Sequence, residues 1–165
     1  MDDRRRRFEA QALPHLDAAY NLARWLSRSP ADADDIVQDA MLRAFRAFDG
    51  FRGGDAKAWI LTIVRNCWRT AGTANKRRGY TSLEDENLVA EDDPEDAAVQ
   101  AGARRRFDAL VADLPEEFRT VLILREMEDM SYREIAEITA TPIGTVMSRL
   151  ARARAILRET AKDCL

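Results

Sequence analysis

Residues 131–158 read SYREIAEITATPIGTVMSRLARARAILR, and this stretch decides the fold of the C-terminal part of the chain. Ser131 and Glu134 have the spacing of a capping box, so we expect a short helix to begin there. Thr141 is expected to cap a second helix, with Pro142 at its first position, where the missing N–H costs nothing. Two helices joined by a turn of a few residues predict a helix-turn-helix.

The second helix of this pair has two chemically distinct faces. Apolar residues recur on one face, which we expect to anchor the helix: Ile143, Val146, Leu150, Ala153 and Leu157. Hydroxyl and guanidinium groups occupy the opposite face: Thr145, Ser148, Arg149 and Arg152. Residues 140–158 contain four arginines and no acid. This charge bias favours a helix that reads the major groove of DNA over one whose arginines are merely solvated.

The 165 residues suffice for one ordinary domain or two small ones, and the net charge is only −3. The charges come in blocks, however. Residues 56–78 contain six basic residues and no acid, whereas residues 79–103 contain eight acids and no base. Such segregation predicts separate functions for the two segments. Because the acidic segment also lacks a helical period and contains Pro94, we expect its first half to be a flexible linker.

Several classes of protein are excluded by what the sequence lacks. Cys67 and Cys164 form no disulfide framework and have no metal-ligand spacing; we expect Cys67 in the core and Cys164 as a free thiol in a reducing cytoplasm. No apolar run suits a signal peptide or a membrane span. His15 is the single histidine, and no catalytic set surrounds it. We therefore expect no enzyme, no metal and no cofactor.

Helical periodicity runs along the chain and strand-like alternation is absent, so the expected fold is all-α. The expected helices span residues 13–26, 30–48 and 56–74, then resume near 104 with a break at Leu114-Pro115. Ser29 is expected to cap the second of them, and glycine-rich residues 49–55 to end it. This organisation predicts two small helical domains, residues 1–78 and 104–165, joined by the acidic linker 79–103.

On the expected helix 30–48, the face opposite the apolar one is acidic and carries one leucine. Its members are Asp35, Gln38, Asp39, Leu42 and Arg46. A leucine ringed by carboxylates suits the docking of a basic protein partner, although a plain solvated face would give the same pattern.

The expected helix 56–74 and the loop before it combine basic and aromatic residues. Arginine and lysine match phosphates, asparagine can pair with a base edge, and aromatic rings stack on unpaired bases. The candidate DNA contacts are Phe51, Arg52, Trp59, Arg65, Asn66, Arg69, Lys76 and Arg77. The alternative is that Trp59 and Trp68 simply pack the core.

Four motifs, in order, resemble a bacterial sigma factor of the extracytoplasmic function (ECF) group, the minimal members of the sigma-70 family. DADDIVQDAMLRAF at 32–45 is similar to the core-polymerase-binding helix of region 2, and AWILTIVRN at 58–66 to the start of its promoter-melting helix. LPEEFRTVL at 114–122 resembles the opening of region 4, and IGTVMSRLARAR at 143–154 its minus-thirty-five recognition helix. The resemblance covers nearly the whole chain.

The resemblance implies an alternative sigma factor that directs core RNA polymerase to promoters in a stress or envelope response, under the control of an anti-sigma factor. It implies docking on the beta-prime clamp helices through residues 35–46, and a second contact with the beta flap. Residues 51–77 would read and melt the minus-ten element, with a flipped base captured by the loop 49–55. Thr145, Ser148, Arg149 and Arg152 would read the minus-thirty-five element. The free protein would be a cytoplasmic monomer without membrane insertion.

Two departures from the family pattern stand out. Ala140 replaces the glycine often found in the turn, which costs about 1 kcal/mol if the residue has a positive φ. Met147 replaces a frequent lysine or arginine. Two alternatives from other classes remain: a stand-alone helix-turn-helix regulator that binds duplex DNA without polymerase, and a helical adaptor for acidic partners.

Overall fold

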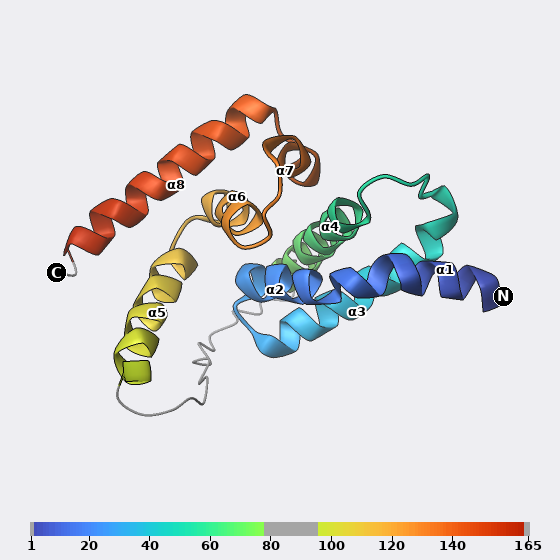
Figure 1. Ribbon diagram of the computed structural model, residues 1–165, viewed down its shortest axis with the longest axis horizontal. Helices are drawn as coiled ribbons and strands as arrows, with labels where there is room; N and C mark the ends of the chain where they lie inside the picture. Colours follow the sequence, from blue (N-terminus) through green and yellow to red (C-terminus); the bar gives the residue numbers. More distant parts are fainter. Residues whose placement is uncertain (1, 78–95, 164–165) are drawn as a thin grey trace.

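The computed structural model describes residues 2–77 and 96–163, and all regular elements in these two ranges are helices (Figure 1). The expected all-α fold is therefore confirmed for the described part of the chain. The helices form an N-terminal group, α1 to α4, and a C-terminal group, α5 to α8.

The N-terminal group begins with a helix that apolar periodicity did not reveal. α1 spans Asp2–Ala12 and buries only Phe8 and Ala12. Its first turns are charged, and Arg6 and Arg7 form i,i+4 ion pairs with Asp2 and Asp3. A short 3-10 turn at Leu13–His15 follows, so the helix expected over 13–26 begins only at Leu16, as α2, Leu16–Ser27.

α3, Pro30–Ala47, starts as its sequence predicts. The Ser29 hydroxyl accepts a hydrogen bond of 3.3 Å from the Asp32 amide, and Pro30 occupies the first turn. α4, Ala56–Arg77, is capped by the Asp55 carboxylate, which accepts from the Ala58 amide at 3.2 Å. α2, α3 and α4 pack on one another through fully buried aliphatic side chains, among them Leu22, Ala33, Ala44, Leu61 and Val64. This bundle leaves the acidic back of α3 facing solvent.

The C-terminal group comprises α5, Asp96–Ala112, α6, Glu116–Glu126, α7, Tyr132–Thr139, and α8, Ile143–Asp163. α5 begins eight residues before Arg104, where helix was expected to resume, because alanine supplies helix propensity without an amphipathic period. The break at Leu114-Pro115 is confirmed. Arg119 is buried there, and its Nη1 donates to the carbonyls of Ala112 and Leu114 at 3.0 Å each.

The helix-turn-helix is present, and its capping box is complete. The Ser131 hydroxyl accepts from the Glu134 amide at 3.1 Å, while the Glu134 carboxylate accepts from the Ser131 amide at 3.2 Å. α7 ends at Thr139, and its C-cap residue, Ala140, has the left-handed conformation at φ 53° and ψ 44°. Alanine therefore occupies a position that favours glycine.

The predicted N-cap of α8, Thr141, is one residue too early in the sequence. α8 begins at Ile143, and the Pro142 carbonyl, not that of Thr141, accepts the first helical bond, from Val146 at 3.1 Å. The Thr141 hydroxyl instead pairs with the Thr139 hydroxyl at 2.8 Å. Proline can precede a helix as well as open it, since neither position requires its N–H.

The two groups pack on each other, α2 against α6 and α4 against α7. In Figure 1, α6 and α7 lie beside the N-terminal bundle, and α8 runs along the outer edge to the C-terminus. The docking of α4 against the C-terminal group determines which of its basic residues reach solvent.

Candidate nucleic-acid and protein interfaces

The back of α3 presents an apolar spot among charges. Leu42 is 56% exposed, which confirms its expected position. Asp35, Gln38 and Arg46 are exposed on the same helix, and Asp39 is half-buried. The Asp39 carboxylate pairs with Arg43 at 3.1 Å. We call Asp35, Gln38, Asp39, Leu42 and Arg46 the α3 face; none of its members contributes to the buried core.

Phe51 and Trp59 form a stacked pair at the start of α4. Their ring centroids are 4.7 Å apart with planes inclined by 27°, and Phe48 also stacks with Phe51, at 6.3 Å. Both residues of the pair are partly buried against the core, as is Trp68. Trp59 and Trp68 therefore pack against the core, as the alternative to base stacking predicts. The loop between the rings turns at Gly53 and Gly54, whose φ values of 86° and 96° favour glycine.

The helical pattern predicts Arg65 on the exposed face of α4, and this prediction is wrong. Arg65 is 8% exposed, and its Nε finds no hydrogen-bond partner among the described residues. Burial lowers the pKa of its guanidinium. The positive charges of Arg69 and Arg149 lower this pKa further, whereas the Glu116 carboxylate raises it. The C-terminal group is docked against α4 through α7, and it places Glu116 of α6 and Arg149 of α8 near Arg65, so we attribute the burial to this docking.

The other candidates on and before α4 are distributed differently. Arg52, Asn66 and Arg69 are exposed. Lys76 and Arg77 belong to the last turn of α4, but their side chains lie outside the described part of the chain. In this arrangement, the exposed basic residues of α4 and the buried Arg65 do not form one continuous surface.

The outward face of α8 differs from the expected one in two ways. Ser148 and Arg152 are exposed as expected, but Thr145 is half-buried and Arg149 leans toward α6, 3.5 Å from the Glu117 carboxylate. Ile143 was expected on the anchoring face, yet it is 43% exposed. Val146, Leu150 and Ala153 provide the anchor, and Ile143 lies one turn before it. Met147 is 53% exposed beside Ser148.

Contacts between the two groups were not foreseen from the sequence. The Glu128 carboxylate receives Lys57 from α4 at 3.2 Å and the Asn21 amide from α2 at 2.8 Å. Nearby, a hydrogen bond with the Glu134 carboxyl group, and the amides of Ala58 and Lys57, hold the pKa of Asp55 below its usual value. No periodicity marks such pairs, because their partners are far apart in the sequence.

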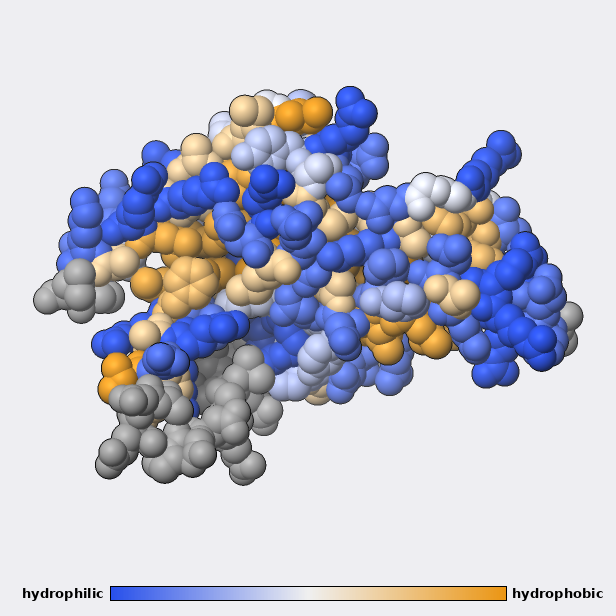
Figure 2. All heavy atoms as spheres, viewed as in Figure 1, coloured by the Kyte–Doolittle hydropathy of each residue, from blue (hydrophilic) through white to orange (hydrophobic). Residues whose placement is uncertain are grey.

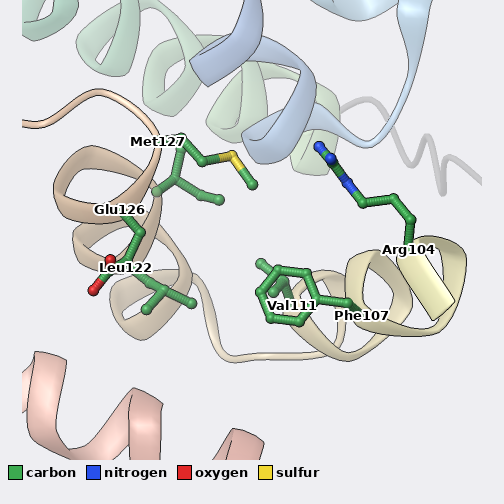
Figure 3. A pocket seen from close by; sticks show the side chains of 7 residues that line it. Arg104, Phe107, Val111, Leu122, Glu126 and Met127 are labelled. Atoms are coloured by element: carbon green, nitrogen blue, oxygen red, sulfur yellow. The ribbon is translucent and has the colours of Figure 1, made fainter. Parts of the chain in front are cut away.

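A pocket opens between α5 and α6. Its volume is about 300 Å³, and its walls are mostly apolar: Arg104, Phe107, Val111, Leu122, Ile123, Glu126 and Met127. Figure 3 shows Phe107 and Val111 on α5 facing Leu122 on α6 and Met127, the residue that follows α6. Apolar side chains gather in the hollow between α5 and α8 in Figure 2. The pocket offers shape and apolar contact but no catalytic constellation, and the residues described contain no group of side chains suited to a metal ion.

None of the helices described in residues 2–77 and 96–163 has the length and apolar character needed to cross a membrane.

Comparison with known proteins identifies both halves of the chain. Residues 13–78 match the family model of sigma-70 region 2, and residues 104–157 match that of sigma-70 region 4. The chain is 34% identical over 151 residues to the ECF RNA polymerase sigma-E factor of Haemophilus influenzae, covering 82% of this chain and 77% of that protein. It is 37% identical over 134 residues to the sigma-E factor of Escherichia coli K12, covering 74% and 70%.

A solved structure shows the same architecture. The sigma factor RpoE of Bartonella quintana, solved in complex with the anti-sigma factor NepR, matches with a TM-score of 0.80 and 29% identity, covering 94% of this chain and 96% of that one. In this chain, region 2 lies on the bundle α2–α4 and region 4 on the helix-turn-helix group. The chain belongs to the ECF sigma factors of the sigma-70 family.

Proposed function

We propose that this chain is an alternative sigma factor that binds core RNA polymerase through the α3 face and directs it to promoters whose upstream element is read by α8. The observation that carries the proposal is the presence on one chain of two separate exposed surfaces with different chemistry. One is an apolar spot among carboxylates, centred on Leu42. The other is the hydroxyl- and arginine-bearing face of a recognition helix. A regulator that only binds duplex DNA would need the second surface alone.

We assign the steps of promoter recognition to the parts of the chain as follows. Residues 1–78 act as region 2, which docks on the beta-prime clamp helices and reads and melts the minus-ten element through residues of the 51–77 segment. Residues 79–103 act as the acidic tether, and residues 104–165 as region 4. The polymerase supplies the catalysis. Arg65 requires a change in the packing of α4 against the C-terminal group before it reaches DNA, because it is buried in the present arrangement.

The pocket between α5 and α6 suits a second protein contact. An apolar side chain fits between Phe107 and Met127, and Phe107 is already partly exposed at its rim. We assign this pocket to the beta flap of the polymerase. Burial of an aromatic anchor in such a pocket is the usual source of interface affinity.

We also propose control by an anti-sigma factor. RpoE, whose fold matches nearly the whole of this chain, was solved in complex with the anti-sigma factor NepR. We place the protein in the cytoplasm, where RNA polymerase and the chromosome are found.

In vitro transcription with sigma-free core polymerase on a genomic promoter pool tests the proposal. Specific run-off products that depend on this protein are expected. A Leu42→Asp variant that is folded, but neither co-purifies with core nor yields run-off, would locate the defect in polymerase binding. Tight sequence-specific duplex binding without core, together with no run-off from any promoter, would favour the stand-alone regulator.

A further inference from the structure

Two large apolar side chains lie exposed at the beginning of the recognition helix. Ile143 and Met147 are one helical turn apart in α8, and 43% and 53% of their surfaces are accessible. Gly144 between them is also exposed, and a Cβ added to it would meet nothing within 4 Å. A single exposed apolar residue is ordinary, but two at adjacent positions of a helix terminus form a patch. We call Ile143, Gly144 and Met147 the apolar patch.

The apolar patch borders the polar face of α8 at Ser148, about 100° around the helix from Met147. Ser148 follows Met147 directly, and Arg152 lies about one turn further along. The Ser148 hydroxyl donates to the Thr145 carbonyl at 3.0 Å and keeps its oxygen lone pairs for other donors. Residues 140–158 contain four arginines and no acid, so the helix that carries the patch suits a polyanion. These neighbours favour DNA over a protein as the occupant of the patch.

Major-groove chemistry offers one apolar feature that such a patch can recognise. Each base pair presents hydrogen-bond donors and acceptors there, but thymine alone also presents a C5 methyl group. Isoleucine has no hydrogen-bonding group, and a thioether is a weak acceptor at most. Their contribution to sequence reading is therefore contact with methyl groups. The flexible methionine side chain adapts its shape to such a contact.

We infer that Ile143 and Met147 read thymine in the upstream promoter element by packing against its C5 methyl group. Recognition helices contact base edges with their N-terminal residues, which is where the patch lies. Four residues advance an α-helix by about 6 Å, close to two base steps of roughly 3.4 Å. The two side chains therefore address methyl groups within about two base steps of each other, while Arg152 is left to donate hydrogen bonds. This inference rests on the proposed function, because it assumes that α8 enters the groove.

Replacement of thymine by deoxyuridine removes the C5 methyl group and leaves every hydrogen-bonding group unchanged. Holoenzyme would first be assembled from core polymerase and the full chain, and an active promoter chosen by transcription. Each thymine of its upstream element would then be replaced singly, and holoenzyme binding measured. One or two positions are expected to lose affinity by about threefold to fivefold, as burial of one methyl group implies. Thymines outside the element serve as the DNA control.

Protein variants link the effect to the patch. In Met147→Ala or Ile143→Ala, the deoxyuridine effect at one position is expected to disappear, so that the two changes are not additive. Met147→Lys is expected to shift the preference at that position from thymine toward guanine, whose O6 and N7 accept hydrogen bonds. Arg158→Ala, a change at an exposed site near the C-terminal end of the same helix, is the matched control and should retain full sensitivity to deoxyuridine.

The possible failures can be told apart. Absence of run-off from every promoter would overturn the proposed function. Normal run-off with no deoxyuridine effect at any upstream thymine would overturn the inference alone. A deoxyuridine effect that persists in both alanine variants would assign the methyl contact to another residue and overturn the inference as well. Loss of core binding in Met147→Ala, with unchanged DNA preference, would mark the patch as a protein-docking site.

Discussion

Lys57 of α4 and Glu128, in the loop between α6 and α7, are joined twice across the two halves of the chain. The Lys57 ammonium lies 3.2 Å from the Glu128 carboxylate and donates to the Glu128 backbone carbonyl at 2.8 Å. The carboxylate is 9% exposed and also accepts from the Asn21 amide. One largely covered acid thus contacts both α2 and α4 across the two halves.

Glu128→Ala is expected to loosen the packing of the two halves. The change removes the carboxylate that the Lys57 ammonium and the Asn21 amide contact, and leaves only the backbone carbonyl for Lys57. Lost hydrogen bonds to charged groups typically cost about 1–3 kcal/mol. Energy transfer between dyes on the exposed residues Gln11 and Arg158 would report a larger population of open molecules. Glu126→Ala is the control, because its 2.6 Å pair with Arg154 is exposed and lies within the C-terminal group. Equal transfer in both variants would show that Glu128 does not hold the halves together.

Ala140→Gly is expected to stabilise the helix-turn-helix by about 1 kcal/mol. Ala140 has a φ of 53°, a conformation that strains residues with a Cβ and that glycine adopts freely. Ala136→Gly, inside α7, is the control of opposite sign, and should cost about 0.5–1 kcal/mol. Urea unfolding of both variants measures the difference. Destabilisation by Ala140→Gly would contradict the assigned strain.

Leu42→Asp is expected to abolish co-purification with core polymerase while leaving the fold intact. The side chain is exposed, so the new carboxylate remains solvated in the free protein but would face an apolar contact in the complex. Leu13→Asp is the matched control, since Leu13 is 55% exposed on a different part of region 2. Circular dichroism checks the fold of both. Undiminished core binding by Leu42→Asp would exclude the α3 face as the docking surface.

Cys67 is expected to make stability fall at alkaline pH. Burial, followed by the nearby Asp39 carboxylate, raises the pKa of its thiol to about 11. In the unfolded chain the thiol ionises at about pH 8.5, so between there and pH 11 the unfolded state loses a proton that the folded state keeps. The free energy of unfolding should fall over this window, by roughly 2–3 kcal/mol at most, and show no contribution from Cys67 below it.

The difference between the native chain and Cys67→Ala isolates this contribution, because the tyrosines and lysines titrate in both. Urea unfolding from pH 8 to pH 11 gives the two curves. Parallel curves would show that the thiol is not protected by burial.

Local signals in the sequence were sufficient for the elements that depend on neighbours along the chain. The Ser131–Glu134 capping box, the Ser29 cap and the exposure of Leu42 all follow from spacing within one or two helical turns. The burial of Arg65 depends instead on α4 packing against a group more than 40 residues away, which periodicity does not encode. The exposure of Ile143 differs from the prediction for another reason: its phase matches that of the anchor, but at the first residue of α8 the described helices leave 43% of its surface accessible.

Arg152→Ala is expected to reduce discrimination between promoter sequences by roughly 1–3 kcal/mol if the guanidinium reads a base edge. Arg152 is exposed, whereas Arg149 on the previous turn leans toward Glu117 and is only 23% exposed at its side chain. Holoenzyme binding to the cognate promoter and to single-base variants measures the loss position by position. Arg158→Ala is the control and should weaken binding at most uniformly, since it lies near the far end of α8. An equal loss for Arg152→Ala on every sequence, with a salt dependence reduced by one charge, would make Arg152 a phosphate contact, and sequence reading would then fall to Ser148 and the apolar patch.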